Sequence, residues 1–261
     1  MKKYLSLFVC VVLLFSFSAC GASQNKKTKK PPLPPKGDDG IATVLLDAGH
    51  GFRDVGCVSE FLGDTYEHHL TMDFTKRLEK VLREFGYNVL LTHDGENIPN
   101  MAETALEAEA LGIDFDSEKI TPDNNIFEAY ERTVYANVLA KKTEIDLFLS
   151  IHVNANADTD TAEGFEIDYC AENSSSEMSS FAFDAVCTSL EKAYPERRLK
   201  KFADPWEMSF VVNKYTSMPS ILFETAYAST PSEAILLLDA GWREELMQTV
   251  ADGIKDYFEL K

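Results

Sequence analysis

Four side chains that can bind a metal or move a proton stand where the chain changes character. His50 ends the apolar stretch in "TVLLDAGHG", His152 lies in "IDLFLSIHVNAN", and Glu224 follows "SILF". Glu67 begins an amphipathic segment after the loop that carries His50. Because the loops that leave the carboxyl ends of strands in an open α/β sheet converge at one edge, we expect these four side chains to lie close together.

Two histidines and one carboxylate form an open zinc site whose fourth position is left for water. A second carboxylate beside such a site can act as general base and then as general acid. Each residue also has a plainer explanation. A single histidine after a strand is often a turn residue, Glu67 suits the positive end of a helix dipole, and Glu224 can pair with a lysine or arginine. The sequence favours a zinc hydrolase site because all four residues occur at equivalent edges.

The segments that must position these residues alternate between apolar runs and amphipathic stretches. In residues 67–86, Leu70, Phe74 and Leu78 recur at helical spacing before a glycine that ends the pattern. Strands are predicted at residues 43–48, 87–95, 145–156, 164–169 and 219–229, and helices at residues 67–86, 125–143, 175–194 and 231–260. This alternation indicates a single α/β domain with a mostly parallel or mixed sheet and helices on both faces.

The N-terminus reads as a targeting segment. "MKKYLSLFVCVVLLFSFSAC" has a basic start, an apolar run and a small residue before a cysteine, which is typical of a secretory signal. Its end resembles a bacterial lipoprotein box with Cys20 as the residue to be lipidated, and an ordinary cleaved signal is the alternative. We therefore predict a lipoprotein-type signal peptide over residues 1–20, a Lys/Pro-rich tether over residues 21–40, and an exported protein anchored by lipid to a membrane of the cell envelope.

Residues 41–261 are predicted to form the catalytic domain, because a chain that is 45% hydrophobic can bury a full core over this length. Within it, residues 96–124 are acidic and partly helix-favouring, and they stand where a short connection would suffice. This insert is either a lid or specificity element at the site, or a solvated excursion on the surface.

Charge and cysteine content exclude several classes of function. A formal net charge of −18 disfavours nucleic acid as a partner, since no basic face can neutralise phosphates. The cysteines outside the signal, Cys57, Cys170 and Cys187, form no Cys-x-x-Cys pair, which excludes a cysteine zinc knot. Free thiols and a Cys170–Cys187 disulfide both remain open.

Six separated segments together resemble, in order and spacing, the motifs of the zinc-dependent N-acetylmuramoyl-L-alanine amidases, bacterial enzymes that cleave peptidoglycan. These segments are "LLDAGHGFRDVG", "YEHHL", "RTVYAN", "FLSIHVNA", "EGFEIDY" and "PSILFETAYAS". The resemblance implies a sheet surrounded by helices, of the phosphorylase/hydrolase-like kind, and one Zn²⁺ ion held by His50, Glu67 and His152. It also implies that Glu224 is the catalytic residue in hydrolysis of the amide between N-acetylmuramic acid and L-alanine.

The chain departs from the family pattern at several positions. Ala48 stands where the family usually has proline, His93 where it has arginine, and residues 226–230 where it has a Gly-Phe-(Leu/Ile)-Ser-Asn run. Residues 154–167 leave no room for the inhibitory helix that some cell-division members carry after the second histidine. We expect the chemical groups to be retained and the wall of the substrate site to differ. The sequence names no activator protein.

Other residues and other functions stay open at this stage. Arg132 is interpreted as the partner of an acidic core residue rather than as a substrate contact. Asn154 is interpreted either as a group that orients a histidine or the substrate carbonyl, or as a turn residue. His68 and His69 are left without a role because successive helix positions diverge by about 100°. The alternative functions are a zinc peptidase or deacylase for another amide, and a non-catalytic envelope module that binds peptidoglycan.

Overall fold

The computed structural model describes residues 40–120, 127–205 and 210–259. The predicted signal peptide over residues 1–20 and almost all of the predicted tether over residues 21–40 lie outside the described residues.

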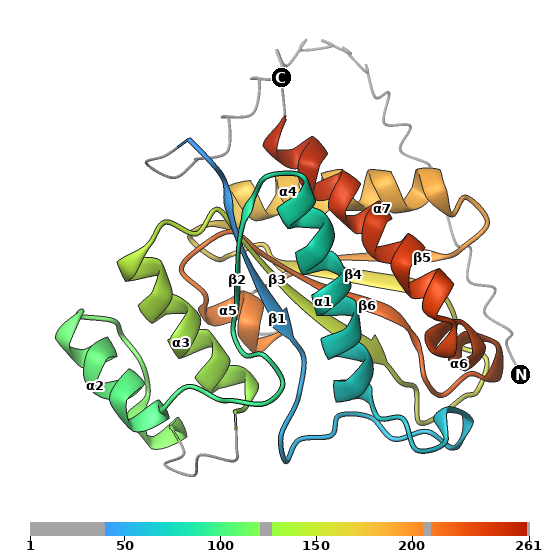
Figure 1. Cartoon of the computed structure of the whole chain (residues 1–261), viewed down its shortest axis with the longest axis horizontal. Coiled ribbons are helices and arrows are strands. Elements are labelled where there is room, and N and C mark those ends of the chain that lie inside the picture. The colour runs from blue at the N-terminus through green and yellow to red at the C-terminus, as the bar shows by residue number, and fades with distance from the viewer. Residues whose placement is uncertain (1–39, 121–126, 206–209, 260–261) are drawn as a thin grey trace, which may run out of the picture. The chain divides into compact units, whose positions relative to one another are not determined.

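Six strands in these ranges form one mixed sheet in the order β2-β1-β3-β6-β4-β5 (Figure 1). The strands are β1 (Thr43–Ala48), β2 (Asn88–Leu91), β3 (Leu147–Asn154), β4 (Phe165–Cys170), β5 (Leu199–Asp204) and β6 (Ser220–Tyr227). Strands β2, β1, β3 and β6 run parallel, whereas β4 is antiparallel to β6 and parallel to β5. The carboxyl ends of β1, β3 and β6 therefore lie at one edge of the sheet.

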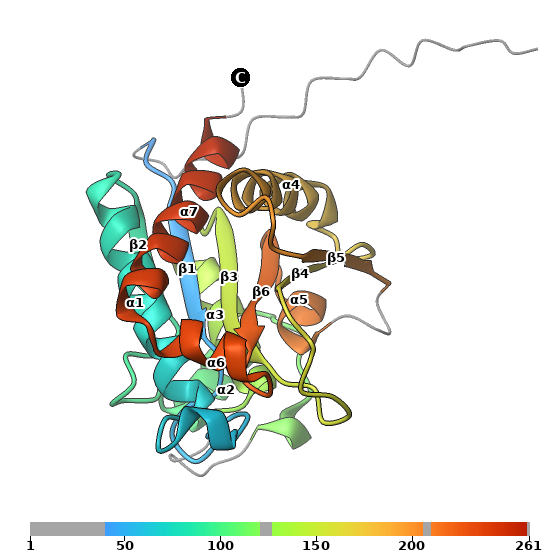
Figure 2. The same cartoon turned by 90° about the vertical axis from the view of Figure 1, so that its right-hand side faces the viewer.

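Helices cover both faces of this sheet (Figures 1 and 2). Helices α1, α4 and α7 pack on one face, and α3 and α5 pack on the other. The helices are α1 (Glu67–Glu84), α2 (Met101–Ala110), α3 (Ala129–Lys142), α4 (Ser176–Ala193), α5 (Val211–Tyr215), α6 (Pro231–Leu238) and α7 (Ala240–Phe258). In β1 the side chains of Val44 and Leu46 join the core on the α1 side, and that of Leu45 joins the core on the α3 side. Burial on both faces explains why this strand is a continuous apolar run.

The single α/β domain predicted from the alternation of segments is confirmed, and β1 has the predicted bounds. Strand β5 was not predicted. Its sequence "LKKFAD" contains no apolar run because it lies at the edge of the sheet, where Phe202 is exposed. The described cysteines Cys57, Cys170 and Cys187 are all free thiols.

The described part of the 96–124 insert forms α2 and the short 3-10 helix η2 (Ser117–Lys119). Ala108 of α2 is fully buried against Val134 and Val138 of α3. Helix α2 therefore has its own small core on α3. The function of the insert stays a prediction.

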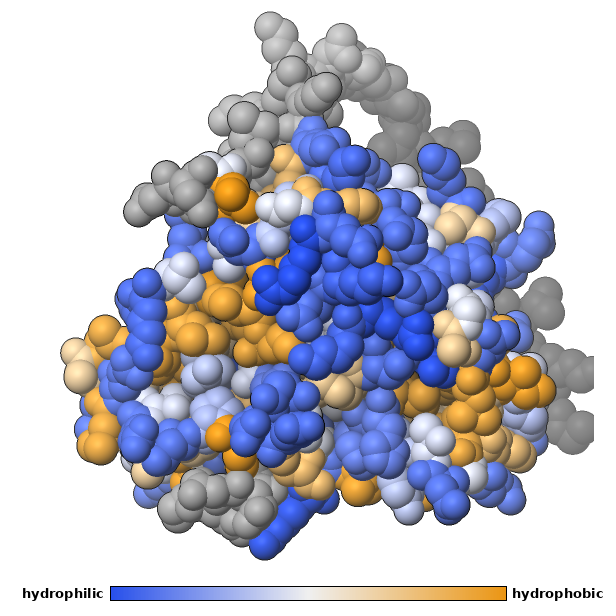
Figure 3. Space-filling view, in the orientation of Figure 1, coloured by the Kyte–Doolittle hydropathy of each residue, from blue (hydrophilic) through white to orange (hydrophobic). Residues whose placement is uncertain are grey.

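Among the described helices, none combines the length and the apolar composition that crossing a bilayer requires. The surface over α1 and α7 is mainly hydrophilic (Figure 3). On α6, Ile235 and Leu238 are exposed.

Candidate metal centre

The loop that follows β1 brings His50 against His152 of β3. His50 adopts a left-handed backbone conformation with φ 65°, which is uncommon for a residue other than glycine. The glycine before it is required by space, because a Cβ atom on Gly49 would lie 2.3 Å from the imidazole ring of His152. The two imidazole rings consequently meet edge to face, with their centroids 4.9 Å apart. The glycine before His50 therefore allows the imidazole rings of His50 and His152 to approach closely.

Glu67, the first residue of α1, reaches the same place from a helix. The backbone N–H of Cys57 donates to Glu67 Oε2 at 2.7 Å, and that of Val153 donates to Oε1 at 3.0 Å. Glu67 Oε1 also lies 3.1 Å from His50 Nε2 and 3.3 Å from His152 Nδ1. The carboxylate is therefore fixed between the loop after β1 and the end of β3.

The donor atoms of His50, Glu67 and His152 lie within 4.8 Å of one another and form a group that can hold a metal ion. With bonds of about 2.0–2.1 Å, two ligand atoms of a tetrahedral zinc site lie about 3.3 Å apart. The distances from Glu67 Oε1 to the two ring nitrogens are close to that value. Two neutral imidazoles and one carboxylate are also the donor set of an open zinc site. The residues present therefore fit a zinc ion.

Asp54 orients one of the imidazoles, and the sequence analysis missed it. Its Oδ2 lies 2.7 Å from Nδ1 of His50, which leaves Nε2 of the same ring facing Glu67. A carboxylate on the second ring nitrogen is the usual way to fix the orientation of a histidine ligand. The sequence does place a carboxylate four residues after His50. Whether the two side chains come into contact, however, depends on the conformation of the loop between them.

The titration of this group reflects its mutual contacts. Burial opposes ionisation of Glu67, but hydrogen bonds and charge from His152 and His50 hold the pKa of its carboxyl well below the usual range. Burial likewise opposes protonation of His50, and Glu67 together with Asp54 raises the pKa of this imidazole. Glu67 is thus ionised, as a metal ligand must be.

Glu224 lies beside this group on the neighbouring strand. It pairs in register with His152 across the parallel strands β3 and β6. Its Oε2 is shielded from solvent and has no hydrogen-bond partner among the described residues, although the residue as a whole is only partly buried. Burial raises the pKa of Glu224 well above its ordinary value, and the carboxylates of Glu67 and Glu166 raise it further. This carboxyl group is suited to take up and release a proton.

Arg132 has the structural role that the sequence analysis favoured. Its Nε lies 2.8 Å from Asp47 Oδ1, and both side chains are buried. Asp47 also accepts hydrogen bonds from the hydroxyls of Thr92 and Ser150, each at 2.7 Å. Burial opposes ionisation of Asp47, but Arg132 and the two hydroxyls lower the pKa of its carboxyl. The pair ties β1, β3 and α3 together beneath the loop that carries His50.

The other histidines do not join the metal-binding group. Nε2 of His93 lies 2.9 Å from the carbonyl oxygen of Ala48, and burial lowers the pKa of its ring. Nδ1 of His68 lies 3.3 Å from the carbonyl oxygen of Val55, and Nδ1 of His69 accepts from the backbone N–H of Tyr66. These contacts are with the backbone, so they have local structural roles.

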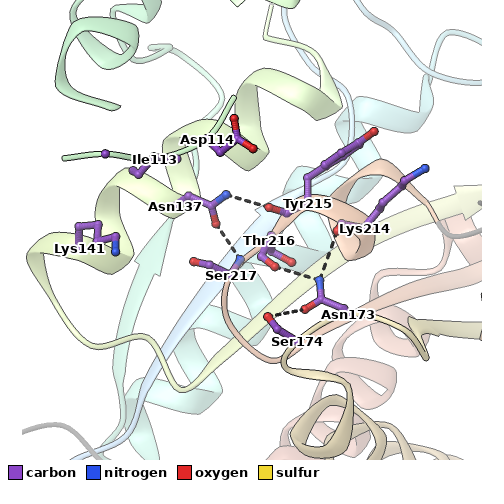
Figure 4. A pocket seen from close by; sticks show the side chains of 11 residues that line it. Ile113, Asp114, Asn137, Lys141, Asn173, Ser174, Lys214, Tyr215, Thr216 and Ser217 are labelled. Carbon is purple, nitrogen blue, oxygen red and sulfur yellow. Dashed lines mark hydrogen bonds between the residues drawn. The ribbon is translucent and has the colours of Figure 1, made fainter. Parts of the chain in front are cut away.

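A polar hollow of about 580 Å³ lies elsewhere, beside the residues that precede β6 (Figure 4). Nδ2 of Asn137 donates to the carbonyl oxygen of Tyr215, and Oδ1 accepts from the backbone N–H of Ser217. Nδ2 of Asn173 donates to backbone carbonyls of residues 213, 214 and 216. Both amide side chains are therefore used to hold α5 and the entry to β6.

Comparison with known proteins gives a family match over residues 44–256, to the model described as N-acetylmuramoyl-L-alanine amidase (Amidase_3). One relative is "Probable cell wall amidase LytH" of Staphylococcus epidermidis, which is 22% identical over 83% of this chain and 58% of the relative. Another is the N-acetylmuramoyl-L-alanine amidase AmiA of Escherichia coli, 24% identical over 85% of this chain and 78% of the relative. The chain thus spans 58% of the length of the LytH relative.

Solved structures show the same fold. The CwlD amidase of Clostridioides difficile, solved in complex with the GerS lipoprotein, superposes with a TM-score of 0.65 at 19% identity. That match covers 84% of this chain and 100% of the other.

Proposed function

Since the chain belongs to the N-acetylmuramoyl-L-alanine amidase family, we propose that it hydrolyses the amide between N-acetylmuramic acid and L-alanine in peptidoglycan. The observation that carries this proposal is the convergence of His50, Glu67 and His152 beside the carboxyl group of Glu224. A module that only binds peptidoglycan has no need of a three-residue donor set next to a shielded, unpartnered carboxyl oxygen.

In this proposal His50, Glu67 and His152 hold one Zn²⁺ ion. When bound, the ion polarises the scissile carbonyl, stabilises developing negative charge and lowers the pKa of water. The remaining work falls to the chain. Asp54 fixes the ring of His50, and the backbone N–H groups of Cys57 and Val153 fix both oxygens of Glu67. The site is therefore held in place by contacts that do not depend on the ion.

Glu224 moves the proton in this mechanism. Oε2 of its carboxylate accepts a proton from the attacking water, and the resulting carboxylic acid returns that proton to the nitrogen of L-alanine as the amide bond breaks. Burial raises the pKa of this carboxyl group, which favours its uptake of the proton from water. An oxygen already committed to an arginine or lysine could not serve in this way, and Oε2 of Glu224 has no such partner among the described residues.

The experiment is a digestion of purified peptidoglycan by the purified chain, with and without a chelator, followed by mass spectrometry of the new ends. We expect an intact glycan strand and stem peptides with a free L-alanine amine, and we expect the chelator to stop their release. New ends inside the stem peptide would instead indicate a zinc peptidase. Binding without any new ends would indicate a non-catalytic module.

Metal content tests the ligand assignment separately from activity. His50→Ala should lose bound zinc in elemental analysis, because two ligands bind the ion far more weakly than three. His69→Ala is the matched control, since this exposed imidazole lies two residues after Glu67 and contacts the backbone of Tyr66. Equal zinc in His50→Ala and in the unaltered chain would remove His50 from the ligand set.

The proposed place of action is the cell envelope, with residues 1–20 as an export signal and Cys20 as the lipid-bearing residue. The layout of residues 1–20 and the relative named as a cell wall amidase support this proposal. Cys20→Ser should release the protein from the membrane fraction of the producing cell. Retention of this variant in the membrane would rule out Cys20 as the anchor.

A further inference from the structure

Three charged residues stand side by side on neighbouring strands next to the proposed metal centre. Glu166 of β4 pairs in register with Glu224 of β6 on one side and with Lys200 of β5 on the other. Adjacent strands are about 4.8 Å apart, so the backbone of Lys200 lies roughly 10 Å from that of Glu224 across the sheet. Glu166 raises the pKa of Glu224, and neither Glu166 nor Lys200 contacts the substrate in the hydrolytic mechanism above.

Both carboxylate oxygens of Glu166 accept hydrogen bonds within this cluster. Nδ2 of Asn154 donates to its Oε2 at 2.8 Å. Lys200 Nζ and the hydroxyl of Tyr227 both donate to Oε1. Asn154 thus contacts Glu166 rather than a histidine, a partner that the sequence did not suggest. The carboxylate of Glu166 therefore holds the side chains of Lys200 and Tyr227 in place.

Tyr227 of β6 is the second partner of Lys200. The strand register between β3 and β6 shifts after the pairing of His152 with Glu224, so that Tyr227 pairs with Asn154. The hydroxyl of Tyr227 accepts a hydrogen bond from Lys200 Nζ. The ammonium group is therefore held from two sides, by a carboxylate and by a phenol.

Lys200 keeps one donor for a ligand. An ammonium group has three N–H donors, and the bonds to Glu166 and Tyr227 use two of them. Its side chain is 28% exposed, whereas Tyr227 is only 3% exposed and offers no aromatic face for a sugar ring. Glu166 and Tyr227 raise the pKa of Lys200 against the effect of burial, so the group stays charged. The cluster thus presents a single positioned N–H donor at the edge of the sheet.

We propose that Lys200, held by Glu166 and Tyr227, determines substrate specificity by donating a hydrogen bond to a carbonyl oxygen of the stem peptide beyond its first residue. The inference rests on the proposed amidase function. The side chain of Lys200 extends from β5 toward β6, because its Nζ contacts Glu166 of β4 and Tyr227 of β6. A stem peptide whose first amide lies at Glu224 can therefore come within reach of this group. A neutral carbonyl suits this position because Glu166 already balances the charge of Lys200.

The test compares two substrates with the same sugar, N-acetylmuramic acid bearing L-alanine alone and N-acetylmuramic acid bearing a four-residue stem. For Lys200→Met we expect kcat/KM to fall about tenfold with the long stem, mainly through KM, because one charge-assisted hydrogen bond is lost. With the single-residue stem we expect a smaller change, confined to kcat, because Glu166 raises the pKa of Glu224 and loses its cationic partner in this variant. Lys200→Arg should restore most of the preference for the long stem, since it retains a cationic donor.

Lys201→Met is the matched control. Lys201 is the next residue of β5, it pairs with Glu191 of α4 at 2.6 Å, and its side chain lies on the other face of the sheet. This variant should behave like the unaltered chain with both substrates.

Two results would overturn the inference while leaving the amidase function intact. An equal loss with both substrates in Lys200→Met would mean that the cluster acts only through Glu224. Unchanged kcat/KM with the long stem would mean that Lys200 contacts no part of the substrate. Failure of the unaltered chain to cleave either substrate would overturn the amidase proposal itself, and this inference with it.

Discussion

Asp47 in one half of the sheet and Glu224 and Asp168 in the other are shielded carboxyl groups with opposite surroundings. In the half formed by β1 and β3, Asp47 is bound by a guanidinium group and two hydroxyls, and the pKa of its carboxyl is lowered. In the half formed by β6 and β4, Glu224 has an oxygen without a partner, and Asp168 lies beside the carboxyl group of Asp204. The pKa values of Glu224 and Asp168 are both raised.

The difference separates a structural role from a chemical one. A buried ion that is paired and hydrogen-bonded holds elements together, and its charge state does not change near neutral pH. A buried carboxyl group without a cationic partner destabilises its own ionised form, and that is the property a general base and acid needs. The comparison predicts that changes at Asp47 and Arg132 alter stability, whereas a change at Glu224 alters turnover.

The largest effect is expected for Glu224→Gln. The amide keeps the shape and size of the side chain but cannot accept the proton of water, so turnover of muropeptides should fall by a factor of about 10² to 10⁴. Zinc content and the urea midpoint of unfolding should stay at or above those of the unaltered chain, because an unpartnered buried charge has been removed. Steady-state kinetics and elemental analysis of the same preparation measure both.

Glu163→Gln serves as the control for Glu224→Gln, because it removes an exposed carboxylate two residues before β4. It should leave turnover unchanged. A Glu224→Gln variant with near-normal turnover would place Glu224 among the structural carboxylates and remove the contrast between the two halves.

Much of this contrast was accessible from the sequence, since the residues concerned stand at the ends of apolar runs. The strand that precedes His50 and the helix that begins at Glu67 follow from apolar periodicity and from the glycines after them, and the strand that carries His152 follows from its continuous apolar run. The pairing of Arg132 with an acidic core residue was also predicted, and it is confirmed.

The residues that the sequence did not reveal depend on pairings between distant segments. Lys200 meets Glu166 because β5 joins the edge of the sheet, and "LKKFAD" carries no hydrophobic signal for a strand. Glu166 stands beside Glu224 only because β4 runs antiparallel to β6, and strand direction leaves no local mark. Asp54 reaches His50 through a loop with two left-handed residues, His50 and Phe52. A single sequence therefore does not reveal the register between distant strands or the conformation of a loop.

The next largest effect is expected for Arg132→Met. It leaves Asp47 buried with two hydroxyls and no cation, which should lower the free energy of unfolding by about 3–5 kcal/mol at pH 7. The pKa of Asp47 is lowered in the folded chain, so the pair stabilises the fold above the unfolded pKa of about 3.9 and loses this effect as pH falls through the folded pKa. The difference between variant and unaltered chain in urea titrations should therefore narrow in acid.

The double variant Asp47→Asn with Arg132→Met separates two contributions to the loss of stability: the unpaired charge of Asp47 and the lost packing of the Arg132 side chain. It should be more stable at pH 7 than Arg132→Met alone, because no unpaired ion remains. If the single and double variants unfold at the same urea concentration, the cost lies in packing, and the ion pair does not explain the lowered pKa of Asp47.

The smallest effect is expected for Asp168→Asn, and it has the opposite sign. Burial raises the pKa of Asp168, and Asp204 raises it further, so the folded chain keeps a proton there that the unfolded chain releases above about pH 3.9. The stability that this proton supplies is complete below that pH and is lost as pH rises through the folded pKa. Asparagine carries no charge, and its Oδ1 can keep the bond that Asn213 Nδ2 donates at 2.7 Å. The variant should gain about 1 kcal/mol over the unaltered chain at pH 8 and little at pH 4, as measured by thermal unfolding.

Asp204→Asn should give a similar gain, because either substitution removes the repulsion between two carboxylates. A loss of stability at both pH values would show that Asp168 is a compensated carboxylate like Asp47.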